Sequence, residues 1–240
     1  MCSCQADKVN VKKSMIEHYP YVLFNDRLKP APLFNRSGNP YHLCLTEEND
    51  RIRDLDPKDP ERFQALIDRE MKGRYTWGLS PYLEKRDMIL RYFPQMVEEK
   101  RYYHLGVDIV LEASTQLFAP LDSTVMEAGY EDGMGNYGGY VILNTQNPAC
   151  DRAPFYTLYG HLDPESLPSQ NSHLKAGAPM GRIGGFSVNG GWYTHTHMQI
   201  ITGPGLREGY FHKGYCSEKT LHRIHLLCPS PIPLLIGSIL

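Results

Sequence analysis

Hydrophobic and polar positions along the chain follow two different periods, and the period changes near residue 100. In residues 59–73, DPERFQALIDREMKG, apolar side chains recur every three or four positions, which is typical of one face of an amphipathic helix. Asp59 is a favourable N-cap, Pro60 suits the first helical position and Gly73 suits the end. This pattern predicts a helix between Asp59 and Gly73.

A second helix is predicted for residues 80–94, SPYLEKRDMILRYFP. Ser80 would be its N-cap, and Pro94 would end it. The stretch Met15–His18 is compatible with a short helix, whereas residues 25–41 are rich in Asn, Pro and Gly and are expected to form a loop. The first hundred residues are therefore expected to be helical and loop-rich.

From about residue 102, apolar and polar residues alternate and the period becomes two. The alternating stretches are 104–111, 116–130, 138–145, 154–162, 179–186 and 196–202. They are rich in β-branched and aromatic residues and are separated by Gly, Pro, Asn and Asp, which is typical of an antiparallel β-domain. We therefore expect a mainly β protein: an antiparallel sheet or sandwich over residues 101–240, with a helical and loop-rich segment, residues 1–100, packed on it. The chain from about residue 204 is expected to wrap irregularly around the β-domain.

The composition is that of a globular protein with enough apolar material for a core: 41% of the 240 residues are hydrophobic and 22% are charged. The net charge is -2, and no block of Lys and Arg stands out. Because a phosphate backbone is bound by clustered basic residues, nucleic acid is not the expected partner. The six cysteines are scattered without CxxC pairs, so free thiols are expected.

The sequence predicts neither a targeting segment nor a membrane span. The first thirty residues carry several charges and lack the apolar run of a secretory signal. The longest apolar run, IPLLIGSIL at residues 232–240, is far short of the roughly 18 residues that span a bilayer. We therefore expect a soluble, cytoplasmic protein, and the sequence carries no indication of its oligomeric state.

One strand face in the stretch YYHLGVDIV carries an imidazole and a carboxylate. If residues 102–110 form one strand, His104, Gly106 and Asp108 share a face, and the apolar residues between them face the core. Gly106 leaves space between the two polar side chains. Imidazole nitrogen and carboxylate oxygen are both good zinc ligands. By itself the pattern is weak, because a polar strand face without a ligand is the commoner outcome.

Two further histidines stand two residues apart in YTHTHMQI, residues 193–200. On a strand, His195, His197 and Gln199 would share one face, so two imidazoles would lie at short range. His161 follows an aromatic strand and is expected at the strand mouth, on a loop. The remaining histidines have no partner pattern and are expected at the surface: His18, His42, His173, His212, His222 and His225.

Taken in order, H-x-G-x-D, Y-x-H-L and H-x-H followed by an apolar residue form a set that resembles the lysostaphin/LytM-type zinc endopeptidases. The resemblance covers about residues 102–203. It extends to GVDIVLEASTQLFAPLDSTVMEAG, MGNYGGYVIL and LKAGAPMGRIG, which are similar to strands and turns of that family. The resemblance implies an antiparallel β-domain of the LytM type, with zinc as cofactor and hydrolysis of a peptide bond as activity.

By resemblance, His104, Asp108 and His197 would bind zinc, and His161 and His195 would be the catalytic pair. Three protein ligands leave a fourth tetrahedral position for water, as in other catalytic zinc sites. One histidine of the pair would act as general base and the other would stabilise the oxyanion. The sequence does not say which histidine has which role.

The chain also departs from the family's pattern. The last motif reads HTHMQ where the family commonly has HLHFE, so Gln199 replaces a carboxylate that could orient a ligand. Asp122 and Ser123 stand where a turn glycine is usual. A closer resemblance is to the peptidase-like domain that lies between a kinase-like and an aminotransferase domain in some bacterial multidomain proteins. FYTLYGHLDPESL, NGGW, CPSP and GRYTWGLSPYLEKR carry that resemblance.

These resemblances leave three functions open. The leading prediction is a zinc metalloendopeptidase that cleaves a bond in peptidoglycan or in a short peptide containing glycine or D-alanine. One alternative is a cytoplasmic zinc amide hydrolase that acts on a small metabolite. The other is a non-catalytic binding module on the same fold, although members of that kind usually lose ligands that this chain keeps.

Overall fold

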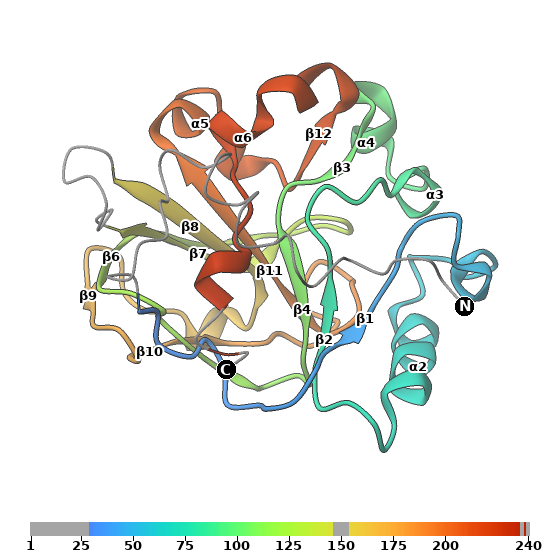
Figure 1. Cartoon of the computed structure of the whole chain (residues 1–240), viewed down its shortest axis with the longest axis horizontal. Helices are drawn as coiled ribbons and strands as arrows, with labels where there is room; N and C mark the ends of the chain where they lie inside the picture. Colours follow the sequence, from blue (N-terminus) through green and yellow to red (C-terminus); the bar gives the residue numbers. More distant parts are fainter. Residues whose placement is uncertain (1–28, 146–153, 236–237, 239–240) are drawn as a thin grey trace.

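The computed structural model describes residues 29–145, 154–235 and 238. At its centre is a sheet of eight strands in the order β1-β2-β4-β11-β8-β7-β6-β9 (Figure 1). Its neighbouring strands are antiparallel, except that β1 and β2 run parallel. The strands in this order are Tyr41–His42, Gly78–Ser80, Val107–Val110, His195–Thr202, Phe155–Leu162, Gly138–Thr145, Ser123–Glu131 and His173–Leu174. The mainly β, antiparallel fold predicted from the sequence is confirmed.

Two smaller sheets and several short helices complete the described part of the fold. β10 (Pro179–Arg182) pairs with β5 (Gln116–Phe118), and β12 (Tyr215–Ser217) pairs with β3 (Arg101–His104). The α-helices are α2 Pro60–Met71, α3 Asp87–Leu90, α4 Pro94–Glu99, α5 Gly203–Arg207 and α6 Ile224–Leu227. The 3-10 helices are η1 Asp50–Ile52, η2 Pro164–Ser166, η3 Tyr210–His212, η4 Glu218–Arg223 and η5 Ile232–Leu235. Within the described ranges, none of these helices has the length and apolarity needed to cross a membrane.

Alternation along the strands gives the large sheet an apolar core on one face. Met198 and Ile200 of β11 lie in this core together with Ile109 of β4. β5 and β10 cover it, and they contribute Leu117 and Met180. The intervening positions of β11 turn to the opposite face of the sheet. The period of two in the sequence therefore separates a core face from a face that carries the histidines.

Helix α2 forms as the sequence predicts. Asp59 is its N-cap and accepts a hydrogen bond from the backbone N–H of Arg62 at 3.0 Å, and Pro60 occupies the first helical position. Phe63 and Ile67 are buried, so the apolar stripe of the helix faces the protein.

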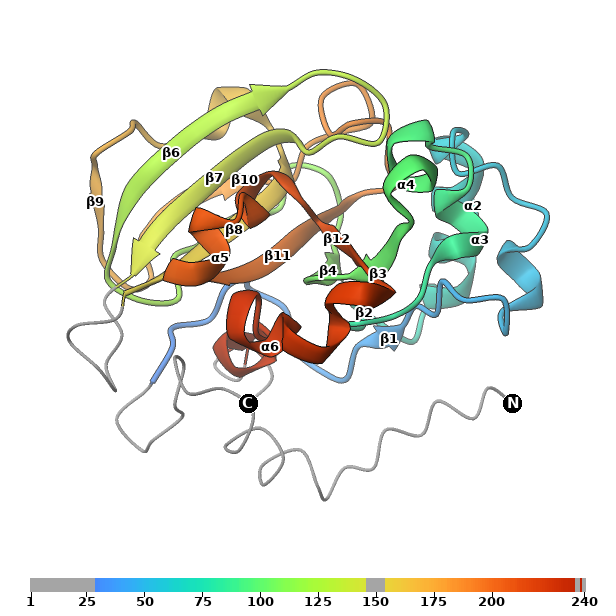
Figure 2. The same ribbon diagram turned by 90° about the horizontal axis from the view of Figure 1, so that it is seen from above.

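The first hundred residues contribute directly to the β-domain. β2 pairs with β4 in the large sheet, and α2, α3 and α4 lie together at that end of the molecule (Figure 2). Phe63 of α2 stacks on Tyr193 with ring centroids 5.2 Å apart. The Thr194 N–H donates to Gln64 Oε1 at 2.7 Å. Helix α2 is thereby attached to the segment that enters β11, and the predicted boundary at residue 100 stays a prediction.

The helix predicted for residues 80–94 is wrong. The stretch begins in β2, α3 covers only four residues, and Pro94 begins α4 instead of ending a helix. The residues between β2 and α3 pair with β3, where the Arg86 N–H donates to the carbonyl oxygen of Tyr102 at 2.9 Å. This pairing and the burial of the Arg86 side chain override the helical propensity of the segment.

The single strand expected over residues 102–110 is interrupted at Gly106. β3 ends before this residue and β4 begins after it, and the two strands belong to different sheets. A Cβ at Gly106 would lie 2.4 Å from the carbonyl oxygen of Met198, so the chain passes too close to β11 for any side chain. His104 and Asp108 therefore approach each other from different sheets and not along one strand face.

The C-terminal part is more regular than expected. It contains the short helices α5 and α6 and the strand β12, which pairs with β3. Cys216 and Cys228 are buried free thiols, in line with the prediction. Other predictions fall on positions outside the described residues, namely the helix at Met15–His18 and the thiols of Cys2, Cys4 and Cys150.

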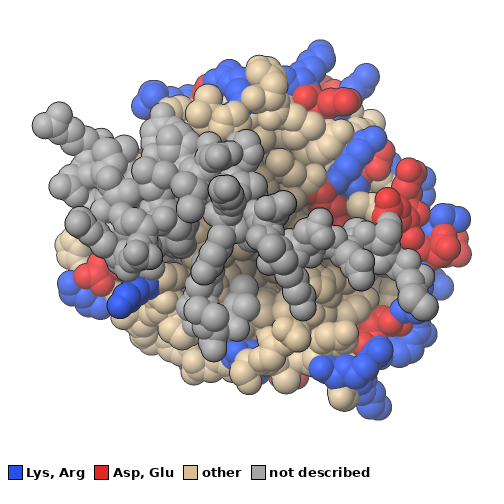
Figure 3. All heavy atoms as spheres, in the orientation of Figure 1, with Lys and Arg blue, Asp and Glu red and all other residues tan. Residues whose placement is uncertain are grey.

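Charged side chains of both signs lie close together on the face shown in Figure 3. Near helices α2 and α3, at the right of the view, Lys and Arg are interspersed with Asp and Glu. The ion pairs of this region include Arg51 with Glu70 and Arg53 with Asp50. This part of the described surface therefore carries mixed charge, in line with the net charge of -2.

Replacement of Phe63 tests whether helix α2 unfolds as one unit with the sheet. Phe63→Ala is expected to lower the free energy of unfolding by about 3–5 kcal/mol, because a buried aromatic side chain is lost. The exposed neighbour Arg62 is the control, and Arg62→Ala should change the same quantity by less than about 0.5 kcal/mol. Chemical denaturation measures both values, and equal effects would show that α2 does not stabilise the domain.

Candidate metal and catalytic centre

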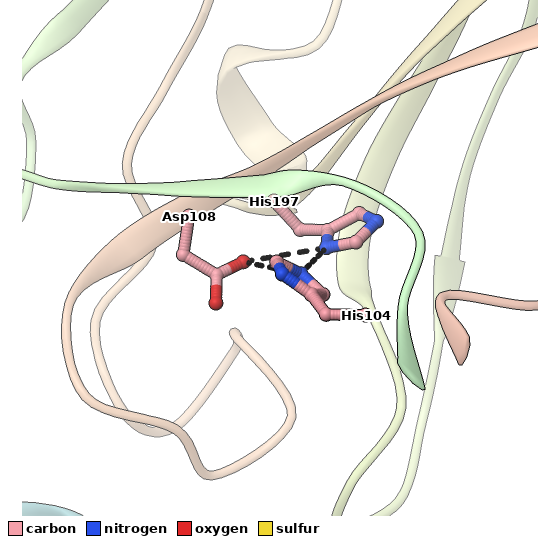
Figure 4. A group of neighbouring side chains, drawn as sticks. All are labelled: His104, Asp108 and His197. Carbon is pink, nitrogen blue, oxygen red and sulfur yellow. Dashed lines mark hydrogen bonds and ion pairs between the residues drawn. The ribbon is translucent and has the colours of Figure 1, made fainter. Parts of the chain in front are cut away.

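Three side chains from three strands meet at one point on the face opposite the core. His104 ends β3, Asp108 lies in β4, and His197 lies directly opposite Asp108 in the β11–β4 register. His104 Nε2 is 3.1 Å from Asp108 Oδ1, and His197 Nδ1 is 3.3 Å from the same oxygen (Figure 4). The two ring nitrogens are 2.9 Å apart. These are the three residues that the family resemblance singles out as zinc ligands.

Hydrogen bonds on the outer side of each ring determine which nitrogen carries the proton. His104 Nδ1 lies 3.0 Å from the carbonyl oxygen of Pro81, which can only accept, so Nδ1–H donates and Nε2 keeps a lone pair. His197 Nε2 lies 3.0 Å from Gln199 Oε1. The Gln199 amide N–H group donates to the carbonyl oxygens of Tyr210 and Lys213, which fixes the amide with Oε1 towards the ring. His197 Nδ1 therefore also keeps its lone pair.

The three inward atoms are all electron-pair donors at neutral pH. Burial and the nearby Arg86 lower the pKa of His104 to about 3, so this imidazole is neutral. Burial alone would raise the pKa of Asp108, but the Arg86 guanidinium that donates to Oδ2 helps to hold it well below its usual value, so the carboxylate is ionised. Three lone pairs thus converge without a proton between them, and a cation placed among them would remove their mutual repulsion.

This donor set fits zinc. Two imidazole nitrogens and one carboxylate oxygen are common zinc ligands, and three protein ligands are typical of a catalytic site. Ligand atoms bound at about 2.0–2.2 Å lie about 3.3–3.6 Å apart in a tetrahedron. The distances of 2.9, 3.1 and 3.3 Å among the three atoms are only slightly shorter.

Gln199 has the orienting role that its place in the HTHMQ motif suggests. Its Oε1 accepts from the His197 ring, and its Nε2 is held by two carbonyl oxygens. A glutamate at this position would present a second oxygen to those two carbonyls, which offer no proton. The amide therefore replaces the carboxylate without loss of the bond to the imidazole.

A second pair of imidazoles lies beside the first group. His195 Nδ1 donates to the carbonyl oxygen of Tyr193 at 2.8 Å, and its Nε2 is 3.6 Å from Asp108 Oδ1. His161 Nδ1 donates to the carbonyl oxygen of Asn189 at 2.8 Å. The ring centroids of His161 and His195 are 4.4 Å apart. Burial lowers the pKa of His195 to about 4 and that of His161 well below its usual value, so both rings are neutral with Nε2 free to accept a proton.

His161 does not lie on a loop beyond its strand, as the sequence suggested, but within β8. Its backbone has φ 63°, in the left-handed region that non-glycine residues rarely adopt. Two hydrogen bonds hold it there: its N–H donates to the carbonyl oxygen of Tyr137, and its carbonyl oxygen accepts from the Gly184 N–H. Such strain is common where a side chain is directed into a functional site.

The site lies in a cavity of about 620 Å³, counting the part that is open to solvent. Leu45, Ile89 and Met96 of the N-terminal segment contribute to its wall, as do Tyr137, Trp192 and Tyr215. His212, which the sequence assigned to the surface, is half-exposed and also lines this cavity, where it contacts Glu131 at 3.3 Å. Asn189 is fully buried, and its side chain bonds the backbone of Trp192.

No sequence pattern indicated the residues that hold the second oxygen of Asp108. Arg86 Nη1 donates to Asp108 Oδ2 at 2.6 Å, and Tyr193 Oη lies 3.3 Å from it. Glu84 and Ser80 bond the same guanidinium group. Ser80, Glu84 and Arg86 come from the stretch that was predicted to be helical. Ser80 is placed by its pairing with Asp108 in β4, and Glu84 and Arg86 are placed by hydrogen bonds to β3.

Two imidazoles and one carboxylate, with two further imidazoles beside them, are the kind of side-chain set that catalytic zinc sites use. Residues 102–206 match the family model of peptidase family M23. This part of the chain matches an M23 peptidase domain, and the possible metal site of the described residues lies within it. The fold class and the family inferred from the sequence are both confirmed. No curated protein sequence matches the chain.

Several solved structures are similar to part of the chain. The catalytic domain of the antimicrobial peptidase lysostaphin from Staphylococcus simulans is 20% identical, with 56% of this chain and 80% of that chain covered and a TM-score of 0.38. A zinc-containing peptidase from Vibrio cholerae is 19% identical, with 42% and 28% covered and a TM-score of 0.35. The catalytic domain of the prophage-encoded M23 protein EnpA from Enterococcus faecalis is 20% identical, with 42% and 69% covered and a TM-score of 0.34. The match thus spans less than a third of the Vibrio cholerae chain.

We propose that the five polar side chains divide into ligands and catalysts, and single substitutions test this. His104→Ala, Asp108→Ala and His197→Ala should each abolish stoichiometric zinc binding, because each removes one of three ligand atoms. His161→Ala and His195→Ala should keep one zinc per chain but lose about 10²–10⁴-fold in turnover. Equilibrium dialysis against zinc measures the first property. If His195→Ala loses zinc as completely as His197→Ala, this division of roles is wrong.

The contact between Gln199 and His197 gives a separate expectation. Gln199→Leu removes the acceptor that fixes the ring, so zinc affinity should fall by about 10–100-fold while the three ligands remain. Gln170→Leu is the control, because this exposed glutamine bonds only a distant backbone carbonyl. Competition with a chromogenic chelator measures both affinities. An unchanged affinity in Gln199→Leu would show that the imidazole needs no support from this side chain.

Proposed function

We propose that this metallopeptidase hydrolyses a peptide bond in a short peptide of the glycine- or D-alanine-containing type that occurs in peptidoglycan. The convergence of five polar side chains is the observation that carries the proposal, because a ligand set and a pair of proton acceptors lie within reach of one point. A binding module would not need a pair of proton acceptors beside the ligand group.

Each of the catalytic residues has a defined part in the proposed reaction. Zinc held by His104, Asp108 and His197 would supply a Lewis acid that polarises the carbonyl and activates water. His161 and His195 each donate Nδ1–H to a fixed backbone carbonyl, so each presents the Nε2 lone pair to the cavity. One of them takes the proton of the attacking water and passes it to the leaving amine. The other can donate to the developing oxyanion only once its Nε2 carries a proton, because its Nδ1–H is already donated to a backbone carbonyl.

One side of the cavity is bounded by a loop packed on a helix, and this favours a small substrate. A Cβ on Gly135, in the loop between β6 and β7, would lie 2.7 Å from the ring of Phe93 at the start of α4. Phe93 also packs on Trp192, with ring centroids 5.0 Å apart. Helix α4 and this loop thus meet at one side of the cavity (Figure 2). A long cross-linked polymer needs a groove that is open along its length, whereas a soluble fragment needs only one entrance.

The same boundary of the cavity supports a second candidate function, hydrolysis of an amide in a small metabolite. The zinc chemistry would be unchanged, and only the group that fills the cavity would differ. The cavity is lined by the aromatic side chains of Tyr137, Trp192 and Tyr215 beside the histidines, and such a mixed lining is typical of small-molecule sites. The two candidates therefore differ in substrate and not in mechanism.

A comparison of substrates separates these candidates. Zinc-loaded protein is incubated with soluble muropeptides, with intact sacculi and with a set of small N-acyl amides, and the products are identified by mass spectrometry. We expect cleavage of the soluble peptides, slow or no release from sacculi, and no cleavage by His161→Ala. Cleavage of the amides alone would favour the metabolite hydrolase. If the protein binds zinc and cleaves none of the three, the proposed activity is wrong.

A further inference from the structure

The two oxygens of Asp108 face different surroundings. Oδ1 points towards the imidazoles, at 3.1 Å from His104, 3.3 Å from His197 and 3.6 Å from His195, whereas the other oxygen points away from the labelled rings in Figure 4. Oδ2 accepts from Arg86 Nη1 at 2.6 Å. One oxygen of the carboxylate therefore faces the candidate metal ligands, and the other binds the guanidinium group.

The guanidinium of Arg86 is fixed on all of its nitrogens. Its side chain is 1% exposed. Nε donates to Glu84 Oε2 at 2.8 Å and Nη2 donates to Ser80 Oγ at 2.7 Å, while Nη1 also lies 3.2 Å from Tyr215 Oη. Because a planar guanidinium presents its donors in a rigid fork, these bonds set the direction of the Nη1 bond to Asp108 as well.

The partner of Arg86 is itself held in place. Glu84 Oε1 accepts from the Leu45 N–H at 2.8 Å, and Glu84 Oε2 accepts from Ser80 Oγ at 3.1 Å. Glu84 and Asp108 are both almost fully buried, and one arginine between two carboxylates lowers the cost of burying three charges. Arg86, Glu84 and Asp108 therefore form a buried, fully hydrogen-bonded network, unlike an ion pair at the surface.

We propose that Arg86 is a positioning residue that keeps Asp108 a one-oxygen ligand. While Nη1 holds Oδ2, only Oδ1 can approach the metal. A carboxylate free to turn could offer both oxygens and take up a position that water and substrate need. Arg86, which comes from the N-terminal segment, therefore preserves the open coordination position of the site. The inference rests on the zinc site of the proposed function.

Cobalt(II) in place of zinc provides a readout that does not depend on activity. Four-coordinate cobalt absorbs visible light strongly, and five- or six-coordinate cobalt absorbs weakly. Arg86→Met removes every donor at similar length but leaves two buried carboxylates facing each other, which can prevent folding. The double variant Arg86→Met/Glu84→Gln removes that repulsion, and its thermal unfolding transition shows whether it folds. Glu84→Gln alone is one control, because its amide oxygen can still accept from Arg86 Nε while Arg86 and Asp108 both remain. Lys85→Ala, at an exposed position next to Arg86, is the second control.

We expect strong absorption from the wild type and from both controls, and weak absorption from the double variant. The crystal structure of its zinc form should show both oxygens of Asp108 on the metal. Its turnover with zinc bound should fall by about 10–100-fold. A folded double variant with the spectrum and ligand geometry of the wild type would overturn the role of Arg86. If the wild type itself binds neither zinc nor cobalt, the proposed function fails, and that outcome is distinct.

Discussion

Hydrogen bonds to backbone and amide oxygens fix the tautomer of each of the four histidines, and the chemistry of the site depends on these tautomers. The carbonyl oxygens of Pro81, Tyr193 and Asn189 and the amide oxygen of Gln199 each accept one ring N–H. Pro81 follows β2, Asn189 and Tyr193 lie between β10 and β11, and Gln199 lies in β11, so the fold has to bring three segments to the outer side of the rings. The inner side is then left with lone pairs around one carboxylate. These lone pairs repel one another when no cation is present. A divalent cation bound among them would remove this repulsion, which favours its binding.

The polar pattern of the sequence was sufficient for the parts of the site that follow strand alternation. His195, His197 and Gln199 share a face of β11 because side chains alternate, and the antiparallel register places His197 opposite Asp108. Helix α2 was also predictable, since its cap and apolar stripe are local properties. The order of the motifs was enough to identify the family, although not the bonds that hold each ring.

What could not be predicted depends on pairing between distant segments. Residues 80–94 have the apolar period of a helix, yet hydrogen bonds to β3 extend the part that carries Arg86. The break at Gly106 follows from the close passage of β11, which lies about ninety residues away in sequence. The left-handed backbone of His161 likewise depends on bonds to distant residues. In each case tertiary contacts outweigh a local preference.

The close packing at Gly106 also bears on which ions the site can accept. A Cβ there would lie 2.7 Å from His197 Cε1, so the backbone of Gly106 stands directly behind that ring, while Gln199 holds its far nitrogen. The imidazole has no room to retreat. Calcium binds oxygen ligands at about 2.3–2.6 Å and adopts six to eight of them, so it would need a wider and more adaptable cage. The close contact at Gly106 thus favours small ions with short bonds, and a larger ion would need both different ligands and a different path of the backbone at this glycine.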